Sequence, residues 1–298
     1  MTAADDGLAP RRMRVAIPGG EVALLRFGGP GAAPLLFAHA NGFCASAYRQ
    51  MFEALGARFD IFAADLRGHG RTHLPAHPQG HRSMAIFGDD LRQTKRALGD
   101  VVGRGARWIV AGHSLGGVAA TLAAASDENV AALRIIEPVA MPRSWSAIAA
   151  TPVWPAIARR LPLVKGAMRR RRAWPSRDAA LASYAAKGFF AKWAPGVLED
   201  YLADGLVIDE TGACLSCAPE WEAANFAAQA NAFWDGLATV RAPVSVLAAA
   251  HPSTTLRGDA KSRFRKLGAR VETATGVTHL VPFEDPRRAA GFLAGFPV

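Results

Sequence analysis

The stretch that most constrains the fold runs from Trp108 to Val118 and reads WIVAGHSLGGV. Its first four residues are apolar and predict a buried strand, and the small residues that follow predict a helix. Between them lies a Gly-x-Ser-x-Gly turn centred on Ser114. A serine on so tight a turn has a strained backbone, so side chains at positions 112 and 116 would collide with it. The pattern therefore predicts a strand–turn–helix unit that exposes the Ser114 hydroxyl.

Apolar runs and helical patterns alternate on both sides of this turn. Short links between them predict an α/β domain with a mostly parallel, twisted sheet flanked by helices. Two strands around Pro18-Gly19-Gly20 predict an antiparallel edge hairpin. The expected strands are 12–17, 21–27, 35–38, 59–64, 108–113, 131–136, 244–249 and 269–274, and the expected helices are 45–55, 83–98, 115–125, 222–234, 261–267 and 287–292.

The pattern changes after Pro138. From there to about residue 224 the sequence holds helical segments, several prolines and, before Trp221, four of the seven tryptophans, but no run typical of a parallel strand. We predict a helical cap over 138–224, inserted after the sixth strand of a core formed by 12–137 and 225–298. Within it, 206–208 and 213–215 predict a small hairpin. Cys214 and Cys217 have CxxC spacing, but no second pair completes a zinc set, so no metal site is expected.

Four separated stretches carry a resemblance to a known family. They are His39-Ala40-Asn41-Gly42, Asp65-Leu66-Arg67-Gly68-His69-Gly70, Gly112-His113-Ser114-Leu115-Gly116-Gly117 and a late His279. In this order they resemble the α/β-hydrolase fold family, in particular its serine esterase and lipase-like branch with a helical cap. The resemblance implies that Ser114 is a nucleophile on a nucleophile elbow and that His279 is its general base. Imidazole suits that role because its pKa lies near neutrality.

The third member of the expected triad departs from the common pattern. The family usually carries an acid after the strand that corresponds to 244–249, but this loop has no carboxylate before Asp259. In some branches the acid lies at the end of the preceding strand, where this chain has Glu137. A carboxylate at a buried strand end needs hydrogen-bond partners, which favours a role for Glu137. Asp259 and a dyad without an acid stay open, and His251 is not excluded from the site.

The resemblance also implies an oxyanion hole, made of the backbone N–H groups of Leu115 and Asn41. The Asn41 side chain and Phe43 are expected to face the substrate pocket. His113 lies inside the elbow and is either structural or a pocket residue. The Asp65–Gly70 loop is expected to be held by hydrogen bonds of Asp65 and Arg67. No metal or organic cofactor is expected.

Composition limits the partners and the compartment. The net charge is +10, and ten Lys/Arg between Arg159 and Lys192 face one acid, Asp178. This basic segment is interpreted as a solvated face, with attraction of an anionic substrate or of an acidic surface as alternatives. Nucleic-acid binding is not expected, because the basic run is not interleaved with aromatic residues.

We expect a cytoplasmic protein without stable membrane insertion. No apolar run has the length of a membrane span, and residues 1–14 do not resemble a secretory signal. Three cysteines do not form a disulfide scaffold. The oligomeric state stays open.

These expectations define one leading function. The chain is expected to be a serine hydrolase that cleaves an ester or related acyl bond of a small, partly apolar substrate through an acyl-enzyme. Hydrolysis of a C–C bond or a lactone and perhydrolysis use the same triad and remain alternatives. A serine nucleophile argues against dehalogenase or epoxide hydrolase chemistry, where the family uses an aspartate. A non-catalytic binding protein with this fold is the alternative of a different class.

Overall fold

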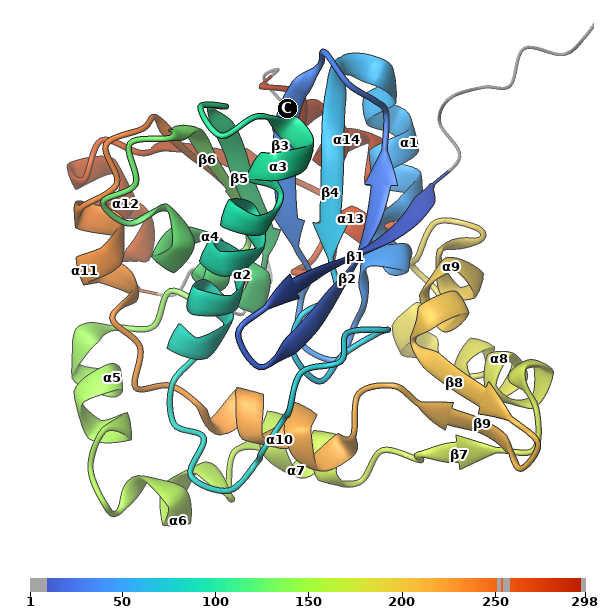
Figure 1. Cartoon of the computed structure of the whole chain (residues 1–298). Coiled ribbons are helices and arrows are strands. Elements are labelled where there is room, and N and C mark those ends of the chain that lie inside the picture. The colour runs from blue at the N-terminus through green and yellow to red at the C-terminus, as the bar shows by residue number, and fades with distance from the viewer. Residues whose placement is uncertain (1–9, 251–252, 254–257, 296–298) are drawn as a thin grey trace, which may run out of the picture.

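The computed structural model describes residues 10–250, 253 and 258–295 of the chain. Its central element is an eight-stranded sheet in the order β1-β2-β4-β3-β5-β6-β10-β11 (Figure 1). The α/β-hydrolase fold predicted from the sequence is confirmed. The strands are β1 (Arg11–Ile17), β2 (Gly20–Phe27), β3 (Ala33–Ala38), β4 (Phe59–Ala64), β5 (Trp108–His113), β6 (Val130–Ile136), β10 (Val244–Ala249) and β11 (Arg270–Ala274).

The strands from β4 to β11 in this order are parallel to one another, whereas β1 and β2 form antiparallel pairs. β1 pairs with β2 as the expected hairpin, and β2 pairs antiparallel with β4. All other neighbours in the sheet are parallel. Because parallel strands end at the same edge, the residues that follow β3, β4, β5, β6 and β10 lie along one edge of the sheet. Asn41, Ser114 and Glu137 follow β3, β5 and β6, and His279 follows β11.

Two helical layers cover the sheet, as Figure 1 shows. One face packs against α2 (Ala85–Ala97), α4 (Leu115–Ala124), α11 (Phe233–Ala238) and α12 (Ala260–Lys266). The other face packs against α1 (Arg49–Leu55), α13 (Val281–Glu284) and α14 (Pro286–Ala294). A short helix α3 (Gly99–Val102) follows α2, and a 3-10 turn η1 (Ala45–Tyr48) leads into α1.

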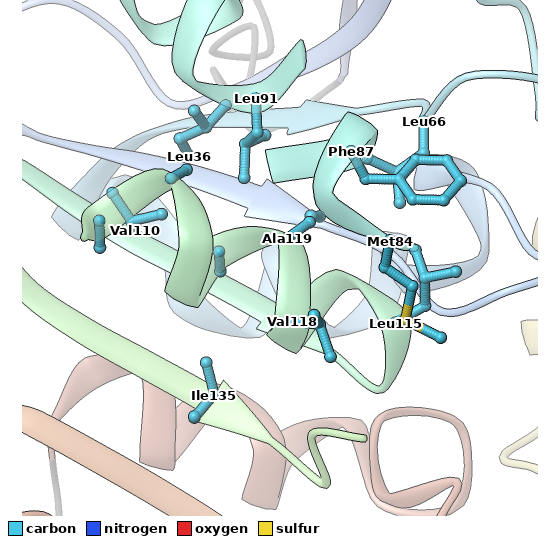
Figure 2. Packing of buried hydrophobic residues seen from close by; sticks show 14 of the residues in the cluster. Leu36, Leu66, Met84, Phe87, Leu91, Val110, Leu115, Val118, Ala119 and Ile135 are labelled. Carbon is cyan, nitrogen blue, oxygen red and sulfur yellow. The ribbon is translucent and has the colours of Figure 1, made fainter. Parts of the chain in front are cut away.

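Neighbouring residues of each central strand enter opposite layers, because side chains alternate across a strand. In β3, Leu36 belongs to the layer of α2 and α4, whereas Leu35 and Phe37 belong to the layer of α1 and α14. Figure 2 shows the first layer, where strand residues meet apolar side chains of α2 and α4: Leu36, Val110, Ile135, Met84, Phe87, Leu91, Leu115, Val118 and Ala119. Burial on both faces explains why these strands are continuous apolar runs in the sequence.

Between β6 and β10 the chain leaves the sheet, and we call residues 138–224 the inserted segment. It contains α5 (Arg143–Ala149), α6 (Trp154–Ala158), α7 (Pro162–Met168), α8 (Arg177–Ala185), α9 (Val197–Asp204), and most of α10 (Pro219–Ala227). It also holds a three-stranded sheet in the order β7-β9-β8. The expected hairpin is present as β8 (Leu206–Asp209) and β9 (Gly212–Leu215), while β7 (Ala173–Trp174) was not anticipated. The domain boundaries stay a prediction, and α10 runs across the one placed at residue 224.

The helix predicted over 222–234 is wrong in its extent. The structure has two helices there, because α10 ends at Ala227 and α11 begins at Phe233. The intervening residues pair with the segment before α2: the Ala230 N–H donates to Arg82 O at 3.0 Å. The Asn231 side-chain oxygen accepts from the Met84 N–H at 2.7 Å. These tertiary hydrogen bonds replace the helical ones, which the local apolar pattern does not reveal.

No helix among the described residues combines the length and apolar character that crossing a bilayer requires.

Close packing of α2 on α4 depends on Gly88. A Cβ atom at this position would lie 2.6 Å from the Leu122 Cβ atom. We expect Gly88→Ala to lower the free energy of unfolding by about 1–3 kcal/mol, because the helices must separate. The control is Gly166→Ala in α7, where a Cβ atom meets nothing within 4 Å. There we expect no loss and a gain of up to about 1 kcal/mol from helix propensity. Urea unfolding checks both, and equal stability of the two variants would contradict the expectation.

Candidate active site

Ser114 lies between β5 and α4, on a turn that only small neighbours permit. Its φ is +57°, in the left-handed region that a serine rarely adopts. A Cβ atom at Gly112 would lie 2.1 Å from the Gly116 carbonyl oxygen. One at Gly116 would lie 2.0 Å from the Ala38 carbonyl oxygen at the end of β3. Side chains at positions 112 and 116 would therefore collide, although with the backbone of Gly116 and of Ala38 and not with the serine backbone that the sequence suggested.

The structure brings Ser114, His279 and Glu137 into one hydrogen-bonded line. His279 follows β11, and its Nε2 lies 3.0 Å from Ser114 Oγ. Its Nδ1 lies 3.1 Å from Glu137 Oε2. An ionised carboxylate only accepts hydrogen bonds, so the ring proton belongs on Nδ1 and Nε2 is free to accept the serine proton. This arrangement has the geometry of a nucleophile, a base and an orienting acid.

Glu137 is fully buried at the end of β6, and its backbone φ is +44°. Its N–H donates to Leu247 O at 2.8 Å, which ties it to the neighbouring strand β10. Its carboxylate accepts hydrogen bonds from the Ala249 N–H at 2.8 Å and from the Ser253 hydroxyl at 2.8–2.9 Å. A buried carboxylate is stable only with such partners. Because β6 and β10 are adjacent, an acid on β6 reaches the position that the loop after β10 would otherwise supply.

The alternative residues are not brought to this position. Asp259 lies at the start of α12, where its exposed side chain pairs with Arg263 at 3.1 Å. It is therefore held away from His279, whose Nδ1 already faces Glu137. His251 lies outside the described residues.

The two expected oxyanion donors, the N–H groups of Asn41 and Leu115, donate to no acceptor within the described part of the chain. The N–H groups on either side of Asn41 are used: Ala40 donates to the Tyr48 hydroxyl at 2.9 Å, and Gly42 donates to His69 Nε2 at 3.1 Å. The turn thus leaves one backbone donor available beside Ala40. The assignment of both donors stays a prediction.

The expectation that the Asn41 side chain faces substrate is wrong. Its Nδ2 donates to the Glu222 carbonyl oxygen at 2.9 Å, and its Oδ1 accepts from Asn225 Nδ2 at 2.9 Å. Both partners lie on α10. The amide therefore fixes the turn to α10 instead of being available to a ligand.

His113 is also not a pocket residue, because its side chain is fully buried. Its Nδ1 lies 2.8 Å from the Tyr48 hydroxyl, and its Nε2 lies 2.8 Å from the His279 carbonyl oxygen. A carbonyl only accepts, so the His113 proton belongs on Nε2, and Tyr48 donates to Nδ1. Burial lowers the pKa of His113 well below its usual value, which keeps the ring neutral. The resulting chain joins the Ala40 N–H through Tyr48 and His113 to the backbone of His279.

The loop after β4 is structural, as the sequence indicated. The Asp65 carboxylate accepts from the N–H groups of Ala45 and Arg71 at 2.8 and 2.9 Å. Arg67 forms two hydrogen bonds with the Asp90 carboxylate at 2.7 and 2.8 Å. Such charge-assisted pairs fix orientation as well as position. The loop therefore places His69, whose Nε2 accepts from Gly42, against the turn that follows β3.

Sequence reasoning missed the residues of the inserted segment and α10 that reach this turn. Arg170 forms an ion pair with Glu222, and its Nη2 donates to the hydroxyls of Tyr184 at 2.7 Å and Tyr201 at 3.0 Å. The Tyr201 hydroxyl in turn donates to the Gly42 carbonyl oxygen at 3.2 Å. No local sequence pattern predicts these contacts, because the partners lie more than a hundred residues from Gly42 along the chain.

Phe43 follows the turn and lies in an aromatic cluster. Its ring is half-buried, and ring-centre distances are 4.8 Å to Phe283, 5.3 Å to Tyr201 and 5.8 Å to Trp193. The cluster joins the turn, the inserted segment and α13. Trp193, Tyr201 and Phe283 are buried, so Phe43 is the partly exposed member of the cluster. The expectation that Phe43 lines the substrate pocket stays a prediction.

The basic segment is only partly neutralised. Arg170 pairs with Glu222 and Arg172 pairs with Glu220. Among the described residues, the other eight of its cations form no ion pair: Arg159, Arg160, Lys165, Arg169, Arg171, Arg177, Lys187 and Lys192.

The CxxC cysteines are free thiols, with Cys214 in β9 and Cys217 buried beyond it. Residues 10–250, 253 and 258–295 contain no group of three or more His, Cys, Asp or Glu arranged to hold a metal ion.

Fold and site together define a hydrolase built around a serine at a strand end. A model of the alpha/beta hydrolase family matches residues 35–292, which is most of the chain. The protein therefore belongs to the α/β-hydrolase family. No curated protein matches the chain at a significant level.

Solved structures of low sequence identity share the fold. E-2-(acetamidomethylene)succinate hydrolase is 18% identical, with a TM-score of 0.76 over 96% of this chain and 98% of that one. A thioesterase domain from the curacin biosynthetic pathway is 14% identical, with a TM-score of 0.72 over 96% and 99%. A thermophilic esterase from Thermogutta terrifontis is 20% identical, with a TM-score of 0.66 over 96% and 97%. At these identities the likeness establishes the fold alone.

The neutral state of His69 predicts a pH dependence of stability. Burial lowers the pKa of His69 to about 4, whereas an unfolded histidine has a pKa of about 6.5. Between these values the unfolded chain binds a proton that the folded chain does not, so stability falls as pH decreases from about 6.5 to about 4. The limiting slope from this residue is about 1.4 kcal/mol per pH unit.

We expect His69→Gln, whose amide oxygen can still accept from Gly42, to reduce that slope by about this amount. Urea unfolding at pH 4.5, 5.5, 6.5 and 7.5 measures it. The same slope in both proteins would show that His69 is protonated in the folded chain.

Proposed function

We propose that the protein is a serine hydrolase that cleaves an ester or related acyl bond of a small, partly apolar substrate through an acyl-enzyme. The observation that carries the proposal is the line Ser114–His279–Glu137, with 3.0 and 3.1 Å between its members. A free serine hydroxyl is a weak nucleophile, and the adjacent imidazole is what activates it.

In the proposed reaction His279 Nε2 takes the proton of Ser114 as Oγ attacks the substrate carbonyl carbon. The carbonyl electron pair moves to oxygen, and the N–H groups of Asn41 and Leu115 stabilise the resulting oxyanion. The imidazolium then protonates the departing alcohol, and the acyl group stays on Ser114. Water, deprotonated by His279, releases the acid and restores the serine. Glu137 holds the ring orientation and stabilises its charged form.

The surroundings of the site support a small acyl substrate with an apolar part. His279 has 20% of its side chain exposed, whereas Glu137 behind it has none, so solvent reaches the base and not the acid. The rings of Phe43, Trp193 and Phe283 lie together beside the turn of Asn41. Phe43 is the partly exposed ring of the three, and an apolar group beside a few fixed polar groups is typical of a small-molecule site.

The nucleophile is tested by Ser114→Ala. We expect kcat/KM toward a p-nitrophenyl ester to fall by at least about 10³-fold, because Ser114 Oγ is the hydroxyl that lies 3.0 Å from His279 Nε2. Labelling by a fluorophosphonate probe should be lost as well. Ser144→Ala, at an exposed position of α5, is the control and should retain both activities. Full activity of Ser114→Ala would refute the proposal, and a folded wild type that the probe does not label would favour the binding-protein alternative.

The acid is tested by comparing Glu137→Gln with Asp259→Asn. We expect Glu137→Gln to lower kcat by about 10³- to 10⁴-fold, since a neutral amide does not stabilise the imidazolium or fix the ring tautomer. Asp259→Asn should stay within about twofold of wild type, because this side chain is exposed and pairs with Arg263. Steady-state kinetics with one ester measures both. A large loss in Asp259→Asn and none in Glu137→Gln would assign the acid to Asp259.

A further inference from the structure

The turn at Asn41 and Gly42 is held by hydrogen bonds, most of them from the inserted segment and α10. Gly42 has a φ of +76°, and a Cβ atom there would lie 2.7 Å from Glu222 Oε1 and 3.0 Å from Arg170 Nη1. The turn is therefore in direct contact with residues of the inserted segment and α10. A side chain at position 42 would collide with Arg170 and Glu222, which occupy the space beside the glycine.

Hydrogen bonds reach the turn at three points. The Asn41 side chain is fixed by the Glu222 carbonyl and by Asn225. The Gly42 N–H donates to His69 Nε2 from the core side. The Gly42 carbonyl oxygen accepts from the Tyr201 hydroxyl of α9. These contacts orient the two peptide groups on either side of Gly42, and the Asn41 N–H precedes them directly.

Arg170 sets the direction of the Tyr201 hydroxyl. A guanidinium has only donors, so at 3.0 Å from Nη2 the Tyr201 oxygen must accept. The single phenolic proton is then free for the Gly42 carbonyl at 3.2 Å. Tyr184 also accepts from Nη2, at 2.7 Å, so both Nη2 protons have partners. The ion pair with Glu222 balances the charge of the largely buried guanidinium.

We infer that Tyr201, aligned by Arg170, is a positioning residue that fixes the oxyanion donor at Asn41. The inference rests on the proposed function, in which the Asn41 N–H stabilises the tetrahedral intermediate. An oxyanion donor acts through its placement, and a small displacement lowers the rate without altering the groups that react. Docking of α9 and Arg170 against Gly42 therefore controls how well the site stabilises its intermediate, and leaves the Ser114–His279 pair unchanged.

The variants that test this are Tyr201→Phe and its matched control Tyr184→Phe. Each removes one hydroxyl that accepts from Arg170 Nη2 and keeps a buried ring, but only Tyr201 contacts Gly42. We expect Tyr201→Phe to lower kcat toward a p-nitrophenyl ester by about tenfold or more, with KM changed by less than about threefold. Tyr184→Phe should stay within about threefold in both constants.

A boronic acid that forms a tetrahedral adduct on serine is the second readout. Its affinity should fall in Tyr201→Phe by about the same factor as kcat/KM, because both depend on the oxyanion donors. Arg170→Met should reproduce the loss and Arg170→Lys should restore part of it. A role in folding alone would instead lower the thermal midpoint and the active fraction, and with it the apparent kcat, while the boronic acid affinity of the folded protein stays unchanged.

Hydrogen–deuterium exchange separates this inference from the proposed function, because it needs no activity. The peptide that contains residues 40–43 should exchange at least about tenfold faster in Tyr201→Phe than in Tyr184→Phe. Equal exchange and equal kcat in the two variants would overturn the inference while leaving Ser114 chemistry intact. Faster exchange in a protein whose wild type cleaves no ester would keep the positioning contact and overturn the proposed function.

Discussion

The rest of the site depends on the contact between the Ser114 turn and the end of β3. A methyl group at Gly116 would lie 2.0 Å from the Ala38 carbonyl oxygen, so the start of α4 lies directly against the strand beside it. This approach forces Ser114 into a left-handed conformation and brings its hydroxyl to the edge of the sheet. It also places the first N–H of α4 next to the turn that follows β3. Every other part of the site is arranged around a serine whose position is fixed by backbone contact.

The polar groups around the serine form hydrogen bonds in which each donor has one defined acceptor. His113 and Tyr48 connect the Ala40 N–H to the backbone of His279, and His69 accepts from Gly42. Burial lowers the pKa of His113 and of His69, which keeps both rings neutral and each with one donor and one acceptor nitrogen. The site therefore holds two buried neutral histidines, His69 and His113, together with the partly exposed His279.

The sequence predicted the sheet and the positions at its edge because strand ends leave local patterns. Ser114 and Glu137 follow apolar runs and His279 comes after the last expected strand, and the structure brings these three together at hydrogen-bonding distances. The wrong expectations concern contacts between distant segments. Asn41 turns toward α10, and the helix predicted over 222–234 is interrupted by pairing with residues before α2. Arg170 and Tyr201 were not found for the same reason, since their importance depends on how the inserted segment docks.

The absence of a side chain at position 42 has a consequence for how such proteins can change. The space that a Cβ atom would need is filled by Glu222 and Arg170, so the turn beside the serine and the segment above it fit each other as one unit. An exchange of residues 138–224 for the corresponding region of a relative would remove Arg170, Tyr201 and Glu222 from this turn, unless the donor brings equivalent groups, and would leave only the hydrogen bonds to His69 and Asn225. Recombination between family members should therefore succeed when the crossover keeps residues 41–42 together with their partners.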